Sequence, residues 1–461
     1  MRCVQLKMVR SAMISAAHAA FFTRTLAFFL LLSVLFLTSC QPSDHSAGKA
    51  PSFTLAVIPD TQNAVDYTHQ KSAGFALDSS ELFIQQMRYI ADHSVARGGD
   101  IAFAAAVGDV WQHQSKPIDP AHAARGITAI DNPYFAIKVE WTPQTLAFEV
   151  PKAIEGYRIL HEAGLPFGVA PGNHDYDAMW SVAGFPPNVN KLRSELTHTV
   201  EDLGLLHIGG LDNFRSAFGD QSDFFKDKPW YIDSFRGGAN SAQRFSAAGY
   251  TFLHITLEMQ AGDDVLAWIE SVLEKNPGLP TILTTHDFLD TYGRRAASPI
   301  VDLKRVDEGF HNSAEDIWQK LIRRHDQIFL VLSGHHHAQS MRVDNNDSGH
   351  AVYQILADYQ ARGQVGIDHG QPLSAYTGRP EGTGDGWFRL MNFSMSEDYP
   401  RIEVETFSSY YNSRSADLAQ YVGWYRHHEH PQMSDAQFHA ADHYTLELKD
   451  FYRRFGRPAL D

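Results

Sequence analysis

Five short polar motifs, each directly after a short apolar run, constrain the fold of this chain more than any other feature. The apolar runs cover residues 53–58, 101–107, 167–170, 281–285 and 328–332. Short apolar runs bounded by turn residues are typical of strands buried on both faces. The motifs that follow them are Asp60-Thr61-Gln62, Gly108-Asp109, Gly172-Asn173-His174-Asp175, His286-Asp287 and Gly334-His335-His336-His337. In open α/β sheets, ligand-binding groups collect beyond the carboxyl ends of the strands, so we expect the motifs to converge on one edge.

The motifs carry oxygen and imidazole ligands without thiolates, a set that suits Mn²⁺, Fe, Zn²⁺ or Mg²⁺. The carboxylate of Asp109 can bridge two such cations. The remaining ligands divide into Asp60, Gln62 and His337 for one cation and Asn173, His286 and His335 for the other. Two divalent cations roughly 3.5–4 Å apart hold the attacking and leaving oxygens of a displacement and lower the pKa of a bridging water. A pocket with that positive charge favours a phosphate.

Taken singly, these residues have ordinary structural explanations. Asp60 or Asp109 could cap a strand end, Asn173 could occupy a turn, and His286 could be a hydrogen-bonded core histidine. Their joint order favours the metal site. We expect His336 to point away from it, because adjacent side chains in an extended segment point to opposite sides. The histidine-rich run 425–430 lies outside the motifs and is expected to be a solvated loop or the rim of a pocket.

The motif order D-x-[H/Q], GD, GNH[D/E], H and GHxH resembles that of the calcineurin-like metallophosphoesterase superfamily over residues 53–407. The opening Pro59-Asp60-Thr61-Gln62 is similar to a bacterial subgroup of that superfamily. The resemblance implies a four-layer α/β/β/α sandwich of two mixed sheets and a dinuclear metal centre. It also implies hydrolysis of phosphate esters by a hydroxide that bridges the metals, with Asn173 contacting metal and substrate and His174 protonating the leaving oxygen.

Two places depart from the common pattern of that superfamily. Gln62 stands where most relatives have histidine, and a neutral amide oxygen is the weaker ligand. Gln112 and His113 stand where many protein phosphatases have an acid and an arginine. Gln112 also cannot supply the tyrosine that purple acid phosphatases need. We therefore expect no close kinship with either branch.

We expect a single phosphoesterase domain over residues 52–461, with loop insertions near 112–150 and 359–386. Residues 78–97 and 263–275 carry apolar residues on one helical face and predict helices. Alternation in 352–356, 387–393 and 401–407 predicts the strands of a second sheet, each with a more polar face. Long loops at an active edge commonly set specificity. Arg362, in the second insertion, is our candidate for binding the substrate phosphate, and a solvated arginine is the alternative.

The first 39 residues have the layout of a secretory signal, with four basic residues, no acidic residue and a short apolar core. Leu37-Thr38-Ser39-Cys40 resembles the bacterial lipobox, which implies cleavage before Cys40 and lipid attachment to it. Residues 40–51 are then a flexible tether. Gln41, by resemblance to proteobacterial sorting, favours the outer membrane, facing the periplasm or the surface. The alternatives are a simple cleaved signal, or a start at Met8 or Met13.

Charge and cysteine content limit the partners. The formal net charge of −15 makes a long nucleic acid an unfavourable substrate, since no run of basic residues offsets it. Cys3 and Cys40 are the only cysteines, so a processed chain has no pair for an internal disulfide. A chain of 461 residues buries enough apolar surface to fold without one.

Together these features predict an exported, lipid-anchored metallophosphoesterase that hydrolyses phosphomonoesters or small phosphodiesters. Its expected partners are a small phosphorylated substrate and, through the lipid, a membrane. One alternative is a phosphodiesterase acting on nucleotides or phospholipid headgroups. The other is a non-catalytic surface-binding lipoprotein that retains the fold, against which the intact Asp109, Asn173 and His174 argue.

Overall fold

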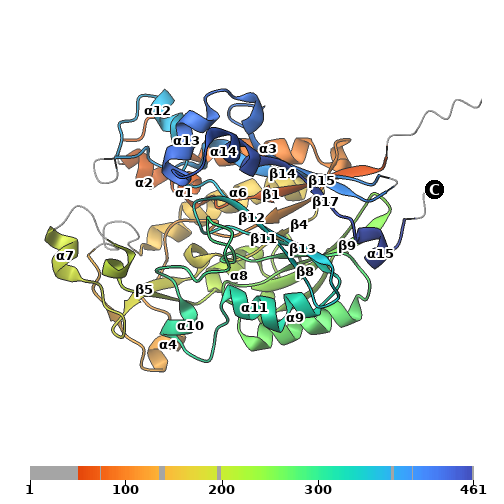
Figure 1. Cartoon of the computed structure of the whole chain (residues 1–461). Helices are drawn as coiled ribbons and strands as arrows, with labels where there is room; N and C mark the ends of the chain where they lie inside the picture. The colour runs from red at the N-terminus through yellow and green to blue at the C-terminus, as the bar shows by residue number, and fades with distance from the viewer. Residues whose placement is uncertain are drawn as a thin grey trace, which may run out of the picture. The chain divides into compact units, whose positions relative to one another are not determined.

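Two seven-stranded sheets form the centre of the structure, a computed structural model (Figure 1). It describes residues 50–72, 74–133, 141–194, 199–374, 378–396 and 398–458, which form one compact unit beginning at Ala50. The predicted signal peptide 1–39 and the predicted lipid-attachment residue Cys40 lie outside the described residues. Within those ranges, no helix is both long and apolar enough to span a membrane.

The first sheet has the strand order β16-β15-β14-β1-β2-β4, with β17 paired to β15. Its parallel strands are β1 (Ser52–Ile58), β2 (Ile101–Ala106) and β4 (Phe167–Val169). Every residue of β2 and β4 is buried, as their continuous apolar sequences predict. Antiparallel pairing adds β14 (Trp387–Ser394), β15 (Arg401–Ser408), β16 (Ser413–Arg414) and β17 (His443–Glu447).

The second sheet has the order β12-β13-β11-β10-β9-β8-β7. Its parallel strands are β9 (Tyr250–Thr256), β10 (Thr281–Thr284), β11 (Ile328–Ser333) and β13 (Ala351–Asp358). The antiparallel strands are β12 (Ala338–Asn345) on one side and β8 (Asn240–Ala247) and β7 (Tyr231–Phe235) on the other.

The predicted strands are present, but their predicted grouping into sheets is wrong. β14 and β15 extend the first sheet, whereas β13 pairs with β11 in the second. The five strands that precede the polar motifs are therefore divided between both sheets. The expected polar face of β13 is also absent, because all its residues from Val352 to Asp358 are buried. Periodicity reports which faces are buried and carries no information about the pairing partner.

The two sheets pack face to face through an aromatic core. Phe53 of β1 stacks on Phe393 of β14, with ring centroids 4.4 Å apart, and meets Phe252 of β9 at 5.1 Å. Phe103 of β2 stacks on Phe245 of β8 at 4.6 Å. Offset and edge contacts of this kind add to the free energy gained by burying the rings.

Helices cover the outer face of each sheet, which gives four layers. α3 (Ser80–Asp92) and α6 (Glu149–Glu162) pack on the first sheet through residues such as Phe83 and Tyr157. α9 (Asp263–Lys275) and α11 (Ala314–Lys320) pack on the second, and lie along it in Figure 1. The predicted helices at 78–97 and 263–275 are thus confirmed as α3, with a 3-10 turn at Val95–Arg97, and α9. The predicted α/β sandwich is confirmed.

Shorter elements occupy the connections. A small third sheet holds β3 (Ala129–Ile130), β5 (Ala178–Val182) and β6 (Leu206–Gly209). The insertion at 112–150 contains α4 (Pro120–Ala124) and β3, and the insertion at 359–386 contains α12 (Gln364–Asp368). The other helices are α1 (Gln62–Val65), α2 (Tyr67–Ser72), α7 (Val189–Ser194), α8 (Asp212–Phe218), α10 (Leu303–Val306), α13 (Tyr421–Glu429), α14 (Asp435–Asp442) and α15 (Phe451–Phe455).

Candidate metal centre

The five polar motifs converge where the carboxyl ends of parallel strands from the two sheets meet. Asp60, Asp109 and Asn173 follow β1, β2 and β4 of the first sheet, and His286 and His335 follow β10 and β11 of the second. A main-chain bond from Gly334 N to the His286 carbonyl, 2.9 Å, joins the ends of β10 and β11. The predicted convergence is confirmed, and it takes place between two sheets instead of along the edge of one.

His286 lies at the centre of the cluster. Its Nδ1 donates to the Val107 carbonyl at 2.9 Å, which turns Nε2 toward the other side chains. Nε2 lies 3.2 Å from Asp109 Oδ2, from Asn173 Oδ1 and from His335 Nδ1. The ligand atoms of Asp109, His286 and His335 are all within 4.8 Å of one another. This is the spacing of side chains that share one cation.

Asp60 and Gln62 form the other half of the cluster. Asp60 Oδ2 accepts from the His335 main-chain N at 3.0 Å, and Gln62 Nε2 donates to Asp109 Oδ2 at 3.1 Å. Asp60 Oδ1 and Gln62 Oε1 are buried without a hydrogen-bond partner. Buried polar oxygens are normally satisfied, so these two fit the coordination of a cation. His337 lines the same cavity as Asp109 and His335, beside this half of the cluster.

Glycines let the motifs approach so closely. A Cβ on Gly334 would overlap with Asp60 Oδ1, and a Cβ on Gly172 would overlap with Asp109 Oδ1. Gly108 has φ +109 and would place a Cβ 2.6 Å from Gly172 N. Asp109 (φ 50) and His335 (φ 74) themselves adopt the left-handed region, a strain of about 1–3 kcal/mol that is typical of functional sites.

The electrostatics of the cluster also match a cation site. Burial and the neighbouring Asp358 raise the pKa of Asp60, because a second negative charge is unfavourable there. Burial alone would lower the pKa of His286, but the carboxylates of Asp109 and Asp60 raise it to about 10. Burial lowers the pKa of His335 to about 3, so its ring is a neutral ligand. The buried carboxylates require positive charge, and divalent cations would supply it.

His174 lies on the wall of the cavity. Its main-chain N donates to Asp109 Oδ1 at 2.8 Å, and its Nδ1 donates to the Gln112 carbonyl at 2.5 Å. With Nδ1 fixed in this way, Nε2 is the nitrogen left to exchange a proton, and it lies 4.0 Å from Asp109 Oδ2. The ring is therefore held at the metal cluster, with one nitrogen available to a substrate.

Two residues of the site were missed in the sequence, and a third, Asp175, was included in a motif without a role. Asp358 and Gln360 follow β13, and Gln360 Nε2 donates to Asp358 Oδ2 at 3.1 Å and approaches Asp60 Oδ2 at 3.5 Å. The signal was present, since Asp358-Tyr359-Gln360 follows an apolar run in the same way as the five motifs. Asp175 accepts from Gly172 N and Val110 N, both at 2.8 Å, and so fixes the turns that carry the ligands.

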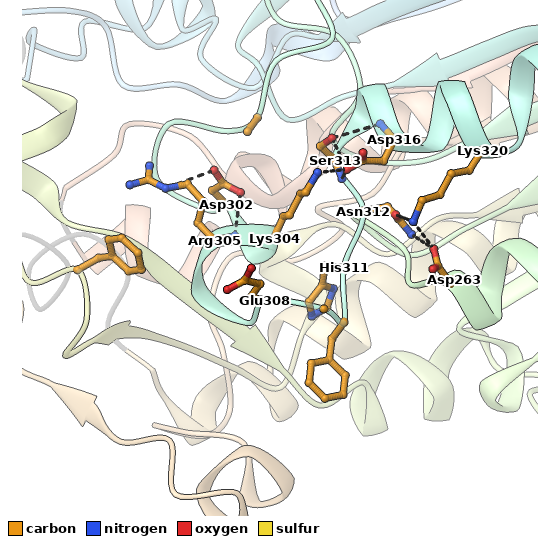
Figure 2. A pocket seen from close by; sticks show the side chains of 14 residues that line it. Asp263, Asp302, Lys304, Arg305, Glu308, His311, Asn312, Ser313, Asp316 and Lys320 are labelled. Atoms are coloured by element: carbon orange, nitrogen blue, oxygen red, sulfur yellow. Dashed lines mark hydrogen bonds and ion pairs between the residues drawn. The ribbon is translucent and has the colours of Figure 1, made fainter.

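The cluster opens into a cavity of about 510 Å³. Its lining includes Asp109, Asn173, His174, His335 and His337, together with Ser298–Val301 from a separate loop. A larger cavity of about 670 Å³ lies elsewhere (Figure 2) and contains none of the predicted ligands. Several charged groups on its wall are paired with one another, as Lys320 Nζ is with Asp263 Oδ1 at 2.7 Å. The predicted ligands therefore lie at the smaller cavity.

Arg362 does not lie in this cavity, so its predicted role as a phosphate ligand is corrected. Its side chain is 1% exposed and donates to both oxygens of Glu429, at 2.7 and 2.8 Å. Tyr359 and Tyr425 flank the guanidinium, which lies 4.2 and 4.7 Å from their ring centroids. The ion pair joins the end of β13 to α13, and it leaves no face of Arg362 for a substrate.

Two further expectations concern histidines outside the ligand set. His336 Nε2 lies 3.2 Å from Asp287 Oδ1, so this ring is directed to a carboxylate of the neighbouring motif. The run 425–430 is mostly helical, as part of α13, so the expectation of a loop is wrong. His428 from this helix does line a cavity of about 260 Å³ that shares His337 with the first cavity, in agreement with the alternative of a pocket rim.

Comparison with known proteins gives little functional information. No protein-family model matches the chain. A curated relative, the uncharacterized protein YvnB of Bacillus subtilis, is 26% identical over 265 residues. The match covers 56% of this chain and 15% of the relative, so the chain spans a small part of the length of that protein.

Proposed function

We propose that this chain is a dinuclear metal-dependent hydrolase of phosphate esters, of the calcineurin-like type. One observation carries the proposal: ligands from five strand ends meet in a single cluster with two buried, unpartnered oxygens on Asp60 and Gln62. Asp60, Gln62, Asp109 and His337 would hold one cation, and Asp109, Asn173, His286 and His335 the other. Divalent cations bound there would supply an activated water and neutralise the charge of the phosphate.

The protein's own groups would position and protonate the substrate. The Asn173 amide lies beside His286 and on the cavity wall, where it would contact a phosphate oxygen. His174 has Nδ1 tied to the Gln112 carbonyl, so Nε2 would carry the proton that the leaving oxygen takes up. A residue in this role is a general acid, which contributes typically 10²–10⁴-fold to the rate.

The size and charge of the cavity favour a small substrate. A volume of about 510 Å³ suits a phosphomonoester or a small phosphodiester. The net charge of −15 disfavours a long nucleic acid. A phosphodiesterase for nucleotides or phospholipid headgroups is the second enzyme proposal. Rates on matched chromogenic monoesters and diesters, each with Mn²⁺, Zn²⁺, Mg²⁺ and Fe²⁺, would separate the two.

The roles assigned to the residues are tested with His174→Ala. We expect a loss of about 10²–10⁴-fold on esters with alkyl leaving groups and a much smaller loss on activated aryl esters, because only the former need protonation. Metal content should not change. His93→Ala, at an exposed position distant in sequence from every motif, is the control and should have wild-type rates. Equal losses on both kinds of ester would assign His174 to positioning.

We also propose that the chain acts outside the cytoplasm, anchored to a bacterial membrane through a lipid on Cys40. The support is the order of basic region, apolar core and lipobox in residues 1–40. A non-catalytic lipoprotein with this fold is the remaining alternative. Absence of turnover on every phosphate ester, in protein shown to contain metal, would favour it.

A further inference from the structure

A second group of metal-ligand side chains lies away from the proposed dinuclear centre. His122 of α4, His207 of β6 and Asp307, just after α10, come from three segments far apart in the sequence. Their ligand atoms lie within 4.8 Å of one another. Asp307 Oδ2 is 3.4 Å from His207 Nε2 and 3.7 Å from His122 Nε2. The sequence analysis did not identify this group.

Hydrogen bonds orient both imidazoles as metal ligands. His122 Nδ1 donates to Asp119 Oδ2 at 2.5 Å, and His207 Nδ1 donates to the Ile208 carbonyl at 2.7 Å. Each Nε2 is thereby turned toward Asp307. Metal-bound histidines almost always donate their other ring N–H to a carboxylate or a carbonyl in this way. Both kinds of acceptor are present here.

The environment of His207 requires a partner for its Nε2. The residue is 0% exposed, and Nε2 has no hydrogen-bond partner. Burial disfavours the charged ring, and in the neutral ring Nδ1 holds the only proton. Nε2 then directs a lone pair at a carboxylate oxygen, an arrangement that is unfavourable until a cation lies between them. Trp180, stacked on the ring at 4.8 Å, limits its rotation.

The spacing agrees with a small tetrahedral ion. Two ligands that are each about 2.1 Å from a tetrahedral Zn²⁺ lie about 3.4 Å apart. The Asp307 distances of 3.4 and 3.7 Å match that value before any adjustment to an ion. Two imidazoles and one carboxylate also form a ligand set that suits Zn²⁺ and disfavours the all-oxygen coordination of Ca²⁺.

The ion pair between Arg125 and Asp307 opposes cation binding at this group. Arg125 donates to both oxygens of Asp307, with Nη1 2.8 Å from Oδ2, and its guanidinium lies 4.4 Å from the ring centroid of Phe310. The arginine neutralises part of the carboxylate charge. Oδ2 keeps a second lone pair, however, and ligating carboxylates are themselves commonly hydrogen-bonded. Arg125 therefore weakens the site and also fixes Asp307 in place.

This group and the catalytic cavity lie on opposite faces of the small third sheet. Met179 and Leu206 line the cavity, whereas Trp180 and His207, the next residue in each strand, lie at the histidine group. Alternate residues of a strand point to opposite faces, so the two sites are separated by the sheet. His311 lies beside the group, its ring centroid 6.4 Å from that of His207, on the wall of the larger cavity in Figure 2.

We propose that His122, His207 and Asp307 bind one Zn²⁺-class cation that is structural and independent of the dinuclear centre. The ion would join α4, the third sheet and the segment after α10. That segment continues from Ser298–Val301, which lines the catalytic cavity. The ion would in this way fix the insertion at 112–150 and the loop at 298–307 around the site. The ion itself would not contact the substrate.

Zinc stoichiometry of the full chain, stripped and then reloaded with Zn²⁺, tests the proposal. In Asp60→Asn/Asp109→Asn/His286→Ala, which removes ligands of both cations of the dinuclear centre, we expect one tightly bound zinc to remain. Adding His122→Ala should remove it, whereas adding His325→Ala, a histidine that faces Glu270 at 3.4 Å, should not. The result is the difference in bound zinc between the variants, so the test holds whether or not the dinuclear centre is catalytic.

Cobalt substitution provides a readout that does not require the His122 variant to fold. The Asp60→Asn/Asp109→Asn/His286→Ala chain loaded with Co²⁺ should show the visible absorption of a four-coordinate nitrogen and oxygen site. Zinc should displace this signal at a stoichiometry of one. A chain that binds no zinc in this background, or equal zinc in the His122→Ala and His325→Ala forms, would overturn the proposal and leave the group as a hydrogen-bonded core cluster.

Discussion

Asp109 connects the ends of two strands with side chains from both halves of the candidate site. Its main-chain carbonyl accepts from Thr61 N and Gln62 N at 3.0 and 2.9 Å, which ties the end of β1 to the end of β2. Its side chain accepts from His174 N and Gln62 Nε2 and faces His286 Nε2. One carboxylate therefore positions ligands of both proposed cations and the proposed general acid.

At this scale we expect Asp109→Asn to remove metal from both sites. An amide cannot neutralise two cations. Removing a residue that only supports a metal ligand costs roughly 10- to 100-fold in metal affinity or activity. We expect the loss of hydrolysis in Asp109→Asn to be larger. Metal analysis and the rate on an aryl phosphate give the result. Asp92→Asn, at an exposed carboxylate paired with Arg97, should leave both unchanged. Two full equivalents of metal in Asp109→Asn would contradict the bridging role.

At the scale of elements, the site is a set of strand ends held by tight turns. The turn after β11 brings Gly334 against Asp60, and the turn after β4 brings Gly172 against Asp109. Side chains on neighbouring sheets could not approach to ligand distance if these positions carried a Cβ. The glycines of the motifs are therefore packing requirements of the candidate metal centre.

Gly334→Ala should weaken metal binding because its methyl group displaces Asp60. We expect a loss of about 1–3 kcal/mol in the free energy of unfolding, the usual cost of overpacking. Metal titration and thermal unfolding measure the two effects. Gly184→Ala provides the matched control, since a Cβ there meets nothing within 4 Å and the backbone is not left-handed. Equal behaviour of the two variants would show that the turn adjusts freely.

The attachment of α13 depends on the buried pair of Arg362 and Glu429. Arg362→Ala would leave the buried Glu429 without its cation, whereas Asp442 would keep Arg389 at 2.9 Å. Breaking a buried pair costs about 3–5 kcal/mol, and we expect that loss in the free energy of unfolding. The exposed Arg97→Ala should cost no more than about 1 kcal/mol. Turnover per folded molecule should stay at the wild-type value, and a large rise in KM would restore Arg362 as a substrate ligand.

At the scale of the whole molecule, we expect the predicted lipid anchor and the proposed hydrolase domain to act separately. Cys40→Ser should release the protein from membranes or stall its precursor, while turnover of the soluble domain is unchanged. Each buried CH₂ of an acyl chain contributes about 0.8 kcal/mol to membrane binding, so loss of the thiol removes the attachment and not the fold. Fractionation with Cys3→Ser as the control measures this. A wholly soluble wild-type protein would refute the anchor.

The fold class and most residues of the cluster could be predicted because both depend on local order along the chain. Apolar runs gave the positions of β1, β2, β4, β10 and β11, and polar residues directly after them gave the cluster. Asp358 and Gln360 could have been found by the same rule. The helices α3 and α9 followed from a periodic apolar face. Arg362 was misassigned because the sequence does not show which carboxylate reaches an arginine 67 residues away.

By itself the sequence determined where the strands of the motifs lie, where they end, and which donor types follow those ends. The tertiary structure alone decided that these ends come from two sheets, that His122, His207 and Asp307 meet, and that Arg362 is paired with Glu429. The physical reason is the separation along the chain over which each kind of interaction acts. Propensity and periodicity act over a few residues, whereas strand pairing and ion pairing are chosen by packing among segments that are distant in the sequence.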